Sequence, residues 1–277
     1  MTVDIDIQNV IKILYGDESN PEYKKVKIFP NHSLKHFKKY KLNNKEVLSR
    51  INSLDEILDL LSYNSIVTCF STNKLDRYFL KLLVQMHNIE RKKYMDYIFE
   101  DYGKKGKILS KKYYDMIKDN LDDQTRYFFD ELYNHCLKSN ISISKLIEKQ
   151  KYEKKIYDMY VKNYLLGKYD DVLKNNKLTV LRINDTNITN VIFENRFDLI
   201  NLSYEFNEHS DIKKLLEKEQ LYKKLLNENG KIQGFVSFEN LDLKDHKIIS
   251  TRSFLDPYTD RNNCKKEYAY MYKNSQK

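Results

Sequence analysis

The side chains most often used for catalysis or metal binding occur at no spacing that lets them act together. His32 and His36 are four residues apart, which suits a metal ion on one face of a helix, but no third ligand accompanies them. His135 and Cys136 are neighbours, so on a helix they point in different directions and do not form a base and nucleophile pair. The sequence contains neither a serine nucleophile elbow nor a phosphate-binding loop. We therefore expect no metal site and cannot name a catalytic residue.

Polar residues at the ends of expected strands are better candidates for binding. Asn201 ends an otherwise apolar strand, where a buried amide needs a partner that a ligand could supply. Asp55 could bind a ligand's amino group, or simply interact with the dipole of the helix that it begins. Ser53, with Glu56 three residues later, predicts a capping box. Asn73 is likewise a good N-cap, so for each of these residues a structural role is the alternative to ligand binding.

The charge balance raises the alternative of a nucleic-acid partner. Lys and Arg number 49 against 40 Asp and Glu, a net charge of +9. Basic runs with interleaved aromatic residues could follow a phosphate backbone and stack on bases. These runs are residues 35–41, 91–93, 104–107 and 149–155. However, Lys, Asn, Ile and Tyr are all common while Gly (6) and Pro (3) are scarce, a joint bias that an AT-rich genome imposes on any protein.

The composition is that of a folded protein. The chain has 277 residues, of which 41% are hydrophobic and 13% aromatic, enough for a sizeable core. Cys69, Cys136 and Cys264 are too far apart for a paired-ligand zinc site or a disulfide framework. Asp4 and Asp6 stand where a signal peptide needs a basic and then an apolar run. We therefore expect a cytoplasmic protein without a transmembrane segment, from an AT-rich microbe or, if viral, in the cytoplasm of its host cell.

Two strand–helix units follow one another directly. The β-branched and aromatic runs at 46–51 and 65–70 predict strands. Apolar stripes at 54–61 and 74–86 predict the helices that follow them. Short connections between such units imply a parallel sheet covered on both faces. Before them we expect a helix at 10–15, an extended segment at 25–30 and a helix at 33–40.

The second half of the chain continues this pattern after an interruption. No strand is evident from 89 to 176, and the segment predicts a helical insertion. Its helical runs lie near 90–102, 111–120, 122–138 and 144–166, the last opened by a polar cap at 142–144. Strands then follow at 178–183, 197–203 and 232–238, with a helix from 212 that ends at Asn229 and Gly230.

The last two expected strands, 247–251 and 268–272, form a hairpin. Five parallel strands that finish in an antiparallel pair are the layout of a class I methyltransferase sheet. The expected fold is thus an α/β, mostly parallel Rossmann-like sheet with a C-terminal antiparallel hairpin and a helical insertion. The expected domain scheme is a segment at 1–45, followed by a domain at 46–277 that the insertion at 89–176 interrupts.

Three segments carry a family resemblance. Residues 47–56 (VLSRINSLDE), 67–73 (VTCFSTN) and 196–203 (RFDLINLS) resemble, in order and spacing, the class I S-adenosylmethionine-dependent family that includes betaine-lipid synthase-type aminocarboxypropyl transferases. The similarity runs from Ile28 to Phe238 and includes an insertion at the same place. It implies a cofactor, S-adenosylmethionine, and a site made of Asn52, Ser53, Asp55, Ser71, Asn73, Asn201 and Ser203.

The chain departs from the family pattern at two positions that matter for the cofactor. Leu54 stands where the family has a glycine, whose lack of a side chain lets the backbone approach the methionine moiety. Ser71 stands where an acidic residue normally accepts hydrogen bonds from both ribose hydroxyls. Both departures indicate an eroded cofactor site.

Three hypotheses about function follow. The first is an enzyme that transfers a methyl or aminocarboxypropyl group to an unknown acceptor, with the insertion as a lid and Tyr94, Tyr97 or Tyr114 as contacts. Because the sulfonium is already activated, such an enzyme mainly positions the acceptor. The second is a non-catalytic methyltransferase-fold scaffold. The third is a basic nucleic-acid-binding protein that uses the insertion.

Overall fold

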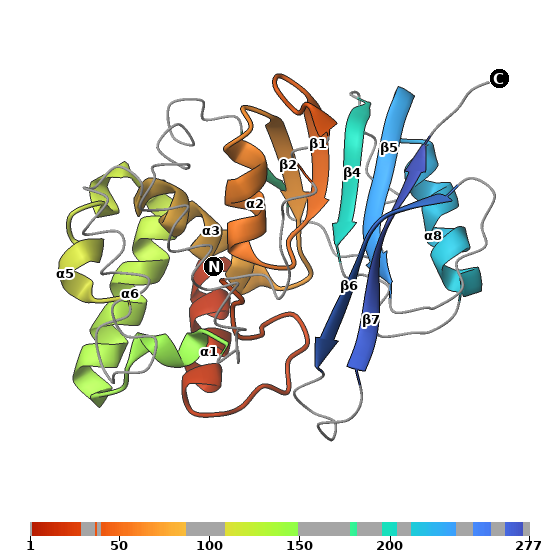
Figure 1. The fold of residues 1–277 in the computed structure, drawn as a ribbon. Coiled ribbons are helices and arrows are strands. Elements are labelled where there is room, and N and C mark those ends of the chain that lie inside the picture. The colour runs from red at the N-terminus through yellow and green to blue at the C-terminus, as the bar shows by residue number, and fades with distance from the viewer. Residues whose placement is uncertain are drawn as a thin grey trace. The chain divides into compact units, whose positions relative to one another are not determined.

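The expected parallel sheet is present. We analysed a computed structural model, which describes residues 2–28, 37, 40–86, 109–148, 178–181, 196–203, 212–236, 246–255 and 264–273. Seven strands pair in the order β3-β2-β1-β4-β5-β7-β6 (Figure 1). The parallel strands are β1 Glu46–Arg50, β2 Ile66–Phe70, β3 Leu178–Leu181, β4 Phe197–Ser203 and β5 Leu226–Val236.

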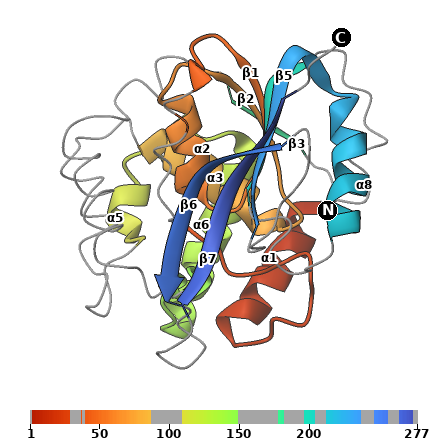
Figure 2. The same cartoon turned by 45° about the vertical axis from the view of Figure 1, so that its right-hand side comes forward.

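Strands β6 His246–Leu255 and β7 Cys264–Lys273 complete the sheet. They pair antiparallel with each other, and β7 also pairs antiparallel with β5, so that it lies between β5 and β6 (Figure 2). The chain therefore has the α/β, Rossmann-like sheet layout that the sequence predicted.

The central strands β1 and β4 are apolar because their side chains are buried on the faces of the sheet. β1 lies between β2 and β4 and contributes Val47 and Leu48, while β4 contributes Leu199 and Ile200. All four side chains are buried. This explains the nearly continuous apolar runs from which the strands were predicted.

Strand β5 begins earlier than expected and contains Gly230. Its pairing with β4 shifts register between the Phe197–Leu226 and Leu199–Lys231 pairs, so extra β5 residues bulge out there. A Cβ atom on Gly230 would lie 2.8 Å from the carbonyl oxygen of Phe197. The glycine therefore serves a close backbone approach inside a strand, and the prediction that it ends a helix is wrong.

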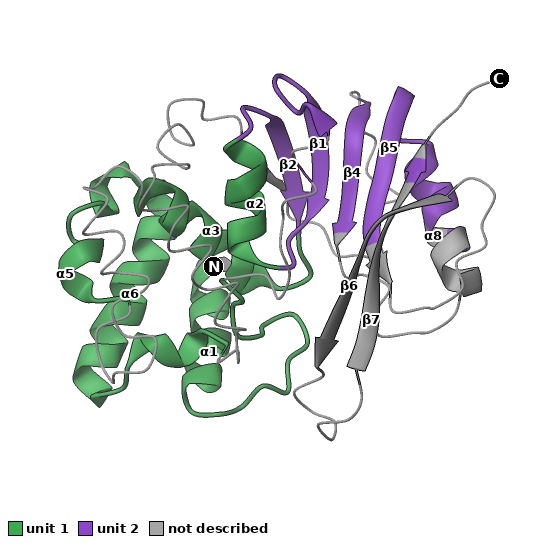
Figure 3. Cartoon of the chain, viewed as in Figure 1, with its two compact units in different colours: residues 1–33, 53–62, 71–176 green, residues 34–52, 63–70, 177–277 purple. Residues whose placement is uncertain are grey.

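The chain divides into two compact units (Figure 3). Unit 1 comprises Met1–Ser33, Ser53–Ser62 and Ser71–Asn176, and unit 2 comprises Leu34–Asn52, Tyr63–Phe70 and Lys177–Lys277. Unit 2 holds the sheet and α8 Ile212–Lys223. Unit 1 holds α1 Thr2–Leu14, α2 Leu54–Leu61, α3 Lys74–Met86, α5 Lys111–Tyr114, η2 Lys118–Asn120, α6 Asp123–Ser139 and η3 Ile143–Leu146.

Aromatic packing joins the helices of unit 1. The rings of Tyr78 on α3 and Phe128 on α6 stack with centroids 3.9 Å apart. Phe79 and Phe129, on the same two helices, meet edge to face at 5.3 Å. Such ring pairs contribute about 0.5–1.5 kcal/mol each beyond the area that they bury, so both pairs stabilise the contact between α3 and α6.

Several expected elements differ in extent. The first helix begins at Thr2 rather than near residue 10, and the helix expected at 111–120 is divided into α5 and η2. The extended segment at 25–30 has a single bridge, between Val26 and Ile147. Most of the helix expected at 33–40, the run at 90–102 and residues 149–166 of the run expected at 144–166 lie outside the described residues. The start of that last run belongs to the short 3-10 helix η3. The domain scheme with its insertion stays a prediction.

Candidate functional site

The N-terminal end of α2 is bound by the chain itself. The amide of Leu54 donates to the carbonyl of Lys27 (3.0 Å), and the amide of Asp55 donates to that of Ile28 (2.9 Å). Ser53 is at the N-cap position in an extended conformation, but its side chain makes no capping hydrogen bond. The capping-box prediction is therefore wrong, because it requires a hydrogen bond from the Glu56 amide to the Ser53 hydroxyl that the structure does not form.

Leu54, which stands where the resemblance expects a glycine, is an ordinary helix residue with a buried side chain. It is the first residue of α2, and its side chain is fully buried. Asp55 is also fully buried and has partners within the chain. Just before the helix, Asn52 Nδ2 and Ser53 Oγ are buried atoms with no hydrogen-bond partner in the described part of the chain.

The N-terminal end of α3 is closed by a side-chain network. The Asn73 side chain accepts hydrogen bonds from the amides of Lys24 (3.0 Å) and Leu75 (3.2 Å). Its amino group donates to the Lys24 carbonyl (3.1 Å) and to Asp76 (2.9 Å). An asparagine side chain can accept two hydrogen bonds and donate two, so the capacity of Asn73 is filled. Asn73 is thus the N-cap that the sequence predicted, and it also holds the Lys24 backbone.

Ser71, which stands where the family resemblance expects an acidic residue, belongs to the same network. Its hydroxyl donates to Asp76 Oδ2 (2.7 Å) and accepts the amide of Asn73 (3.0 Å). Asp76 lies in the first turn of α3 and is 8% exposed. The nearest carboxylate that could replace the family's acid is therefore already bound by Ser71 and Asn73.

One segment supplies the backbone partners at both helix ends. We call residues 22–28 the strap. At its start, the Glu22 carbonyl accepts the amide of Lys74 (2.9 Å), and at its end Lys27 and Ile28 cap α2. Between them, Val26 accepts the amide of Glu148 (2.8 Å) and donates to the carbonyl of Leu146 (2.7 Å). The strap therefore occupies the N-terminal ends of α2 and α3 within unit 1.

In unit 2, three polar side chains form a buried ladder across neighbouring strands. Asn201 on β4 donates to Ser49 Oγ on β1 (3.0 Å), and Gln233 on β5 donates to Asn201 Oδ1 (3.4 Å). All three residues are fully buried. The expected partner of Asn201 is thus found inside the sheet. Ser203 is the last residue of β4 and pairs with Gly234.

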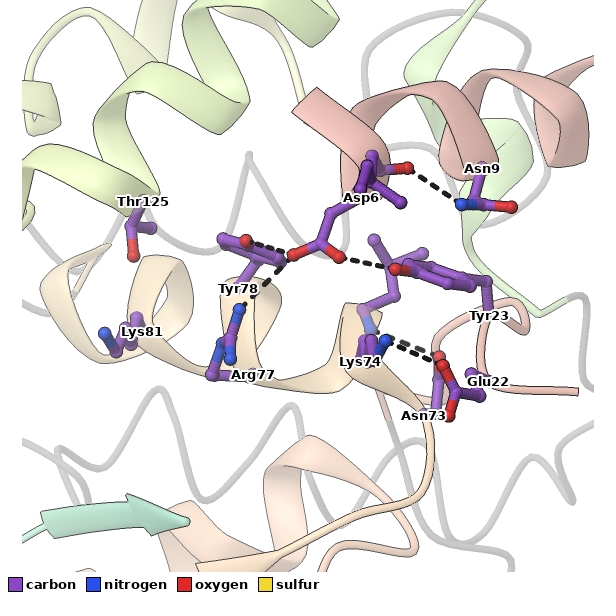
Figure 4. Close-up of polar contacts among 12 residues, drawn as sticks. Asp6, Asn9, Glu22, Tyr23, Asn73, Lys74, Arg77, Tyr78, Lys81 and Thr125 are labelled. Carbon is purple, nitrogen blue, oxygen red and sulfur yellow. Dashed lines mark hydrogen bonds and ion pairs between the residues drawn. The ribbon is translucent and has the colours of Figure 1, made fainter. Parts of the chain in front are cut away.

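A cluster that the sequence analysis missed surrounds Asp6 on α1 (Figure 4). Its carboxylate accepts hydrogen bonds from the hydroxyls of Tyr23 and Tyr78 (2.6 Å for Tyr78) and pairs with Arg77 at 3.5 Å. Burial, and then the hydrogen bond to Asp6, raises the pKa of Tyr78 to about 12 and also raises that of Tyr23. The sequence held one signal for this cluster. Asp6 lies four residues before the apolar Val10, so on a helix the two share one face, and a charged residue on a buried face needs polar partners.

Two further side chains considered in the sequence analysis, Tyr114 and Cys136, are buried within unit 1. Tyr114 is fully buried, and its hydroxyl lies within hydrogen-bonding distance of two acceptors, Asp130 Oδ1 (2.9 Å) and the Arg126 carbonyl (3.1 Å). Burial raises the pKa of the Cys136 thiol to about 11, which keeps it protonated. The described residues contain no group of side chains that could hold a metal ion. His32, His36, Tyr94, Tyr97 and nearly all of the four basic runs lie outside the described residues.

Comparisons with known proteins give no family. No family model and no curated protein matches the chain. An rRNA methyltransferase from Streptomyces viridochromogenes has 8% identity and a TM-score of 0.45 over 95% of this chain and 90% of that one. A putative methylase from Haemophilus influenzae has 10% identity and a TM-score of 0.39 over 91% and 99%. These scores are too low to carry an argument, so the fold assignment rests on strand order and direction.

No described helix is long and apolar enough to cross a membrane. The betaine-lipid synthase-type subfamily, the acceptor and the cytoplasmic location stay predictions from the sequence.

Proposed function

We propose that this chain is a non-catalytic protein with a methyltransferase-like fold, used as a scaffold rather than as an S-adenosylmethionine-dependent enzyme. The observation that supports the proposal best is the strap. It accepts hydrogen bonds from the first two main-chain amides of α2, and the Asn73 side chain at α3 is filled by contacts with Lys24, Leu75 and Asp76. These are the two helix ends from which the family resemblance expects cofactor contacts.

At α2, the residues do not fit the cofactor. A helix N-terminus binds an anionic group through its free amides. Here the amides of Leu54 and Asp55 already donate to main-chain carbonyls. Each such bond is worth about 1 kcal/mol net, so a ligand would have to displace the strap. The fully buried Leu54 side chain gives no room in place of the family's glycine.

At α3, no carboxylate stands at the position from which the family resemblance expects ribose binding. Ribose recognition needs a carboxylate that can accept two hydrogen bonds at once. Ser71 is not a carboxylate, and the Asp76 carboxylate receives a hydrogen bond on each oxygen, from Ser71 and Asn73. In unit 2, Asn201 is engaged with Ser49 and Gln233. We infer that all of these residues now serve the fold.

A second candidate function is methyl transfer, which the strand order favours. The parallel β3-β2-β1-β4-β5 order with an antiparallel β7 is the layout of class I methyltransferases. If the chain is an enzyme, S-adenosylmethionine supplies an activated methyl group and the protein orients the acceptor. Aminocarboxypropyl transfer and nucleic-acid binding are supported by no described residue and stay predictions.

Calorimetric titration of the purified chain with S-adenosylmethionine and S-adenosylhomocysteine separates the two candidates. A scaffold whose helix ends are filled by the strap should give no saturable heat up to millimolar ligand, and no rise in the unfolding temperature. Saturable micromolar binding of either ligand, together with such a rise, would support the enzyme and contradict a scaffold whose cofactor site is filled by the strap.

A further inference from the structure

The sheet of unit 2 ends at β6, whose outer edge is open. The strand pairs with β7 on one side, and no described strand pairs with its other side (Figure 2). β6 is ten residues long. An open edge of this kind leaves a row of main-chain N–H and C=O groups without a strand partner. These are the groups through which an extended segment of another protein adds to a sheet.

An irregularity in β6 aligns its two long basic residues. Lys247 stands opposite Met271, and Arg252 stands opposite Glu267. Opposite residues of an antiparallel pair share a face, and Met271 and Glu267, four residues apart, are on one face of β7. Lys247 and Arg252 are five residues apart, a spacing that places residues of a regular strand on opposite faces. The register shift in the middle of β6 puts both on the same face.

This face of the β6–β7 hairpin carries most of the hairpin's charge. β6 contains no acidic residue. By the same alternation, the face holds four basic residues and one acidic residue, which are Lys247, Arg252, Lys265, Lys273 and Glu267. On the other face, Lys266 is the only residue among Lys, Arg, Asp and Glu. The open edge therefore borders a positively charged surface.

The charge pattern determines which occupant suits the edge. Basic residues and bulges keep the edge strands of identical chains from pairing. Two copies of β6 side by side would bring only like charges together, which is destabilising across strands. A strand with acidic residues converts the same repulsion into attraction. A nucleic acid would also be attracted by the charge, but it has no peptide groups that could continue the ladder.

We infer that the outer edge of β6 is a docking site for an acidic, extended segment of a partner protein. The segment adds to the sheet beside β6, with Asp or Glu at alternate positions on the face that carries Lys247 and Arg252. This inference rests on the proposed function, since a scaffold acts by binding a partner, and it specifies the chemistry of that partner.

Fluorescence anisotropy of the full chain with labelled peptides tests the inference. The probe is a ten-residue peptide, as long as β6, in which glutamate alternates with valine. The control peptide has proline in place of each valine, so it keeps the charge but cannot form a regular strand ladder. We expect saturable binding of the glutamate–valine peptide and binding about tenfold weaker, or none, for the proline peptide.

A pair of matched variants tests the position of the site. Lys247→Gln together with Arg252→Gln should weaken binding of the glutamate–valine peptide about tenfold, because two cross-strand charge pairs are lost. Lys12→Gln together with Lys138→Gln removes the same net charge from exposed positions of unit 1. This control should leave the affinity unchanged.

Several results would overturn the inference. One is the absence of saturable binding of the glutamate–valine peptide. Equal affinity for the proline peptide, or for an oligothymidylate of the same charge, would show attraction by charge alone. Equal weakening in the unit 1 control would show that the edge is not the site. No measurement here involves S-adenosylmethionine, so these results are distinct from failure of the proposed function, which is cofactor binding by the unaltered chain.

Discussion

Two buried asparagines, one in each compact unit, satisfy their amides in different ways. Asn73 in unit 1 bonds mainly to backbone groups, above all both polar groups of Lys24. Asn201 in unit 2 bonds to the side chains of Ser49 and Gln233 on the two neighbouring strands. The backbone amide and carbonyl that Asn73 contacts are present with almost any residue at position 24. The contacts of Asn201, in contrast, require a serine at position 49 and a glutamine at position 233. A buried asparagine can thus be satisfied by the backbone of a distant segment, as Asn73 is, or by polar side chains on neighbouring strands, as Asn201 is.

The largest effect is expected from Asn201→Ala. It leaves Ser49 Oγ and Gln233 Nε2 without this partner in a fully buried region and opens a small cavity. An orphaned buried polar group costs about 1–3 kcal/mol, so we expect a loss of about 3 kcal/mol in the free energy of unfolding. Urea denaturation measures it.

The ladder interpretation also predicts strong non-additivity. Replacing all three members by apolar residues, as in Ser49→Ala, Asn201→Leu and Gln233→Leu together, removes the orphaned groups. The triple variant should be more stable than the sum of the single losses by at least about 1 kcal/mol. Additive losses would show that the three side chains do not act as a unit.

Asn73→Ala should have a smaller effect, about 2 kcal/mol. Loss of an N-cap costs about 1 kcal/mol, and loss of the bonds to Lys24 adds to this. The cost is limited because Lys24 is exposed and water can replace the lost partner at its backbone. Urea denaturation of Asn73→Ala beside Asn73→Ser separates the two contributions. Equal losses in both variants would assign the whole effect to the strap contact rather than to the cap.

The smallest expected effect is on the pH dependence of stability. Alkaline pH should reduce the free energy of unfolding through Tyr78 in unit 1 but not through the ladder in unit 2. Folding raises the pKa of Tyr78 from 10.0 to about 12, so the folded state holds this proton more tightly. The associated stability is complete below about pH 10 and is lost as the pH rises toward about 12. Stability measured between about pH 9 and 11 should fall less steeply in Tyr78→Phe. Asn201→Ala should keep the original slope, because the ladder contains no titratable group. An unaltered slope in Tyr78→Phe contradicts the prediction.

The strands could be predicted from the sequence because each is marked by a short contiguous run of apolar residues. β1, β2 and β4 are short apolar runs, and the short strand–helix connection between β1 and β2 predicts that these two strands are parallel neighbours. The pairing of β1 with the distant β4 does not follow from local connections. The N-cap role of Asn73 was also predictable, since capping involves residues only two or three positions away.

The roles of Ser53 and Asp6 were not predictable in the same way. The serine has the capping-box pattern, yet the amides that follow it bond to Lys27 and Ile28, which are more than 20 residues earlier. Asp6 pairs with tyrosines at positions 23 and 78. Nothing in the local pattern indicates contacts over such separations, and Gly230 misled for the same reason, since its neighbour is the Phe197 backbone.

The position of β7 has a consequence for biosynthesis. This strand is made after β6 yet lies between β5 and β6. Until residues 264–273 leave the ribosome, β6 has no partner among the described strands and the outer side of β5 stays open. Unpaired strand edges are the sites at which nascent chains associate wrongly. The sheet of this protein therefore cannot close before β7 has been made, and termination of translation between β6 and β7 would leave β5 and β6 without this partner.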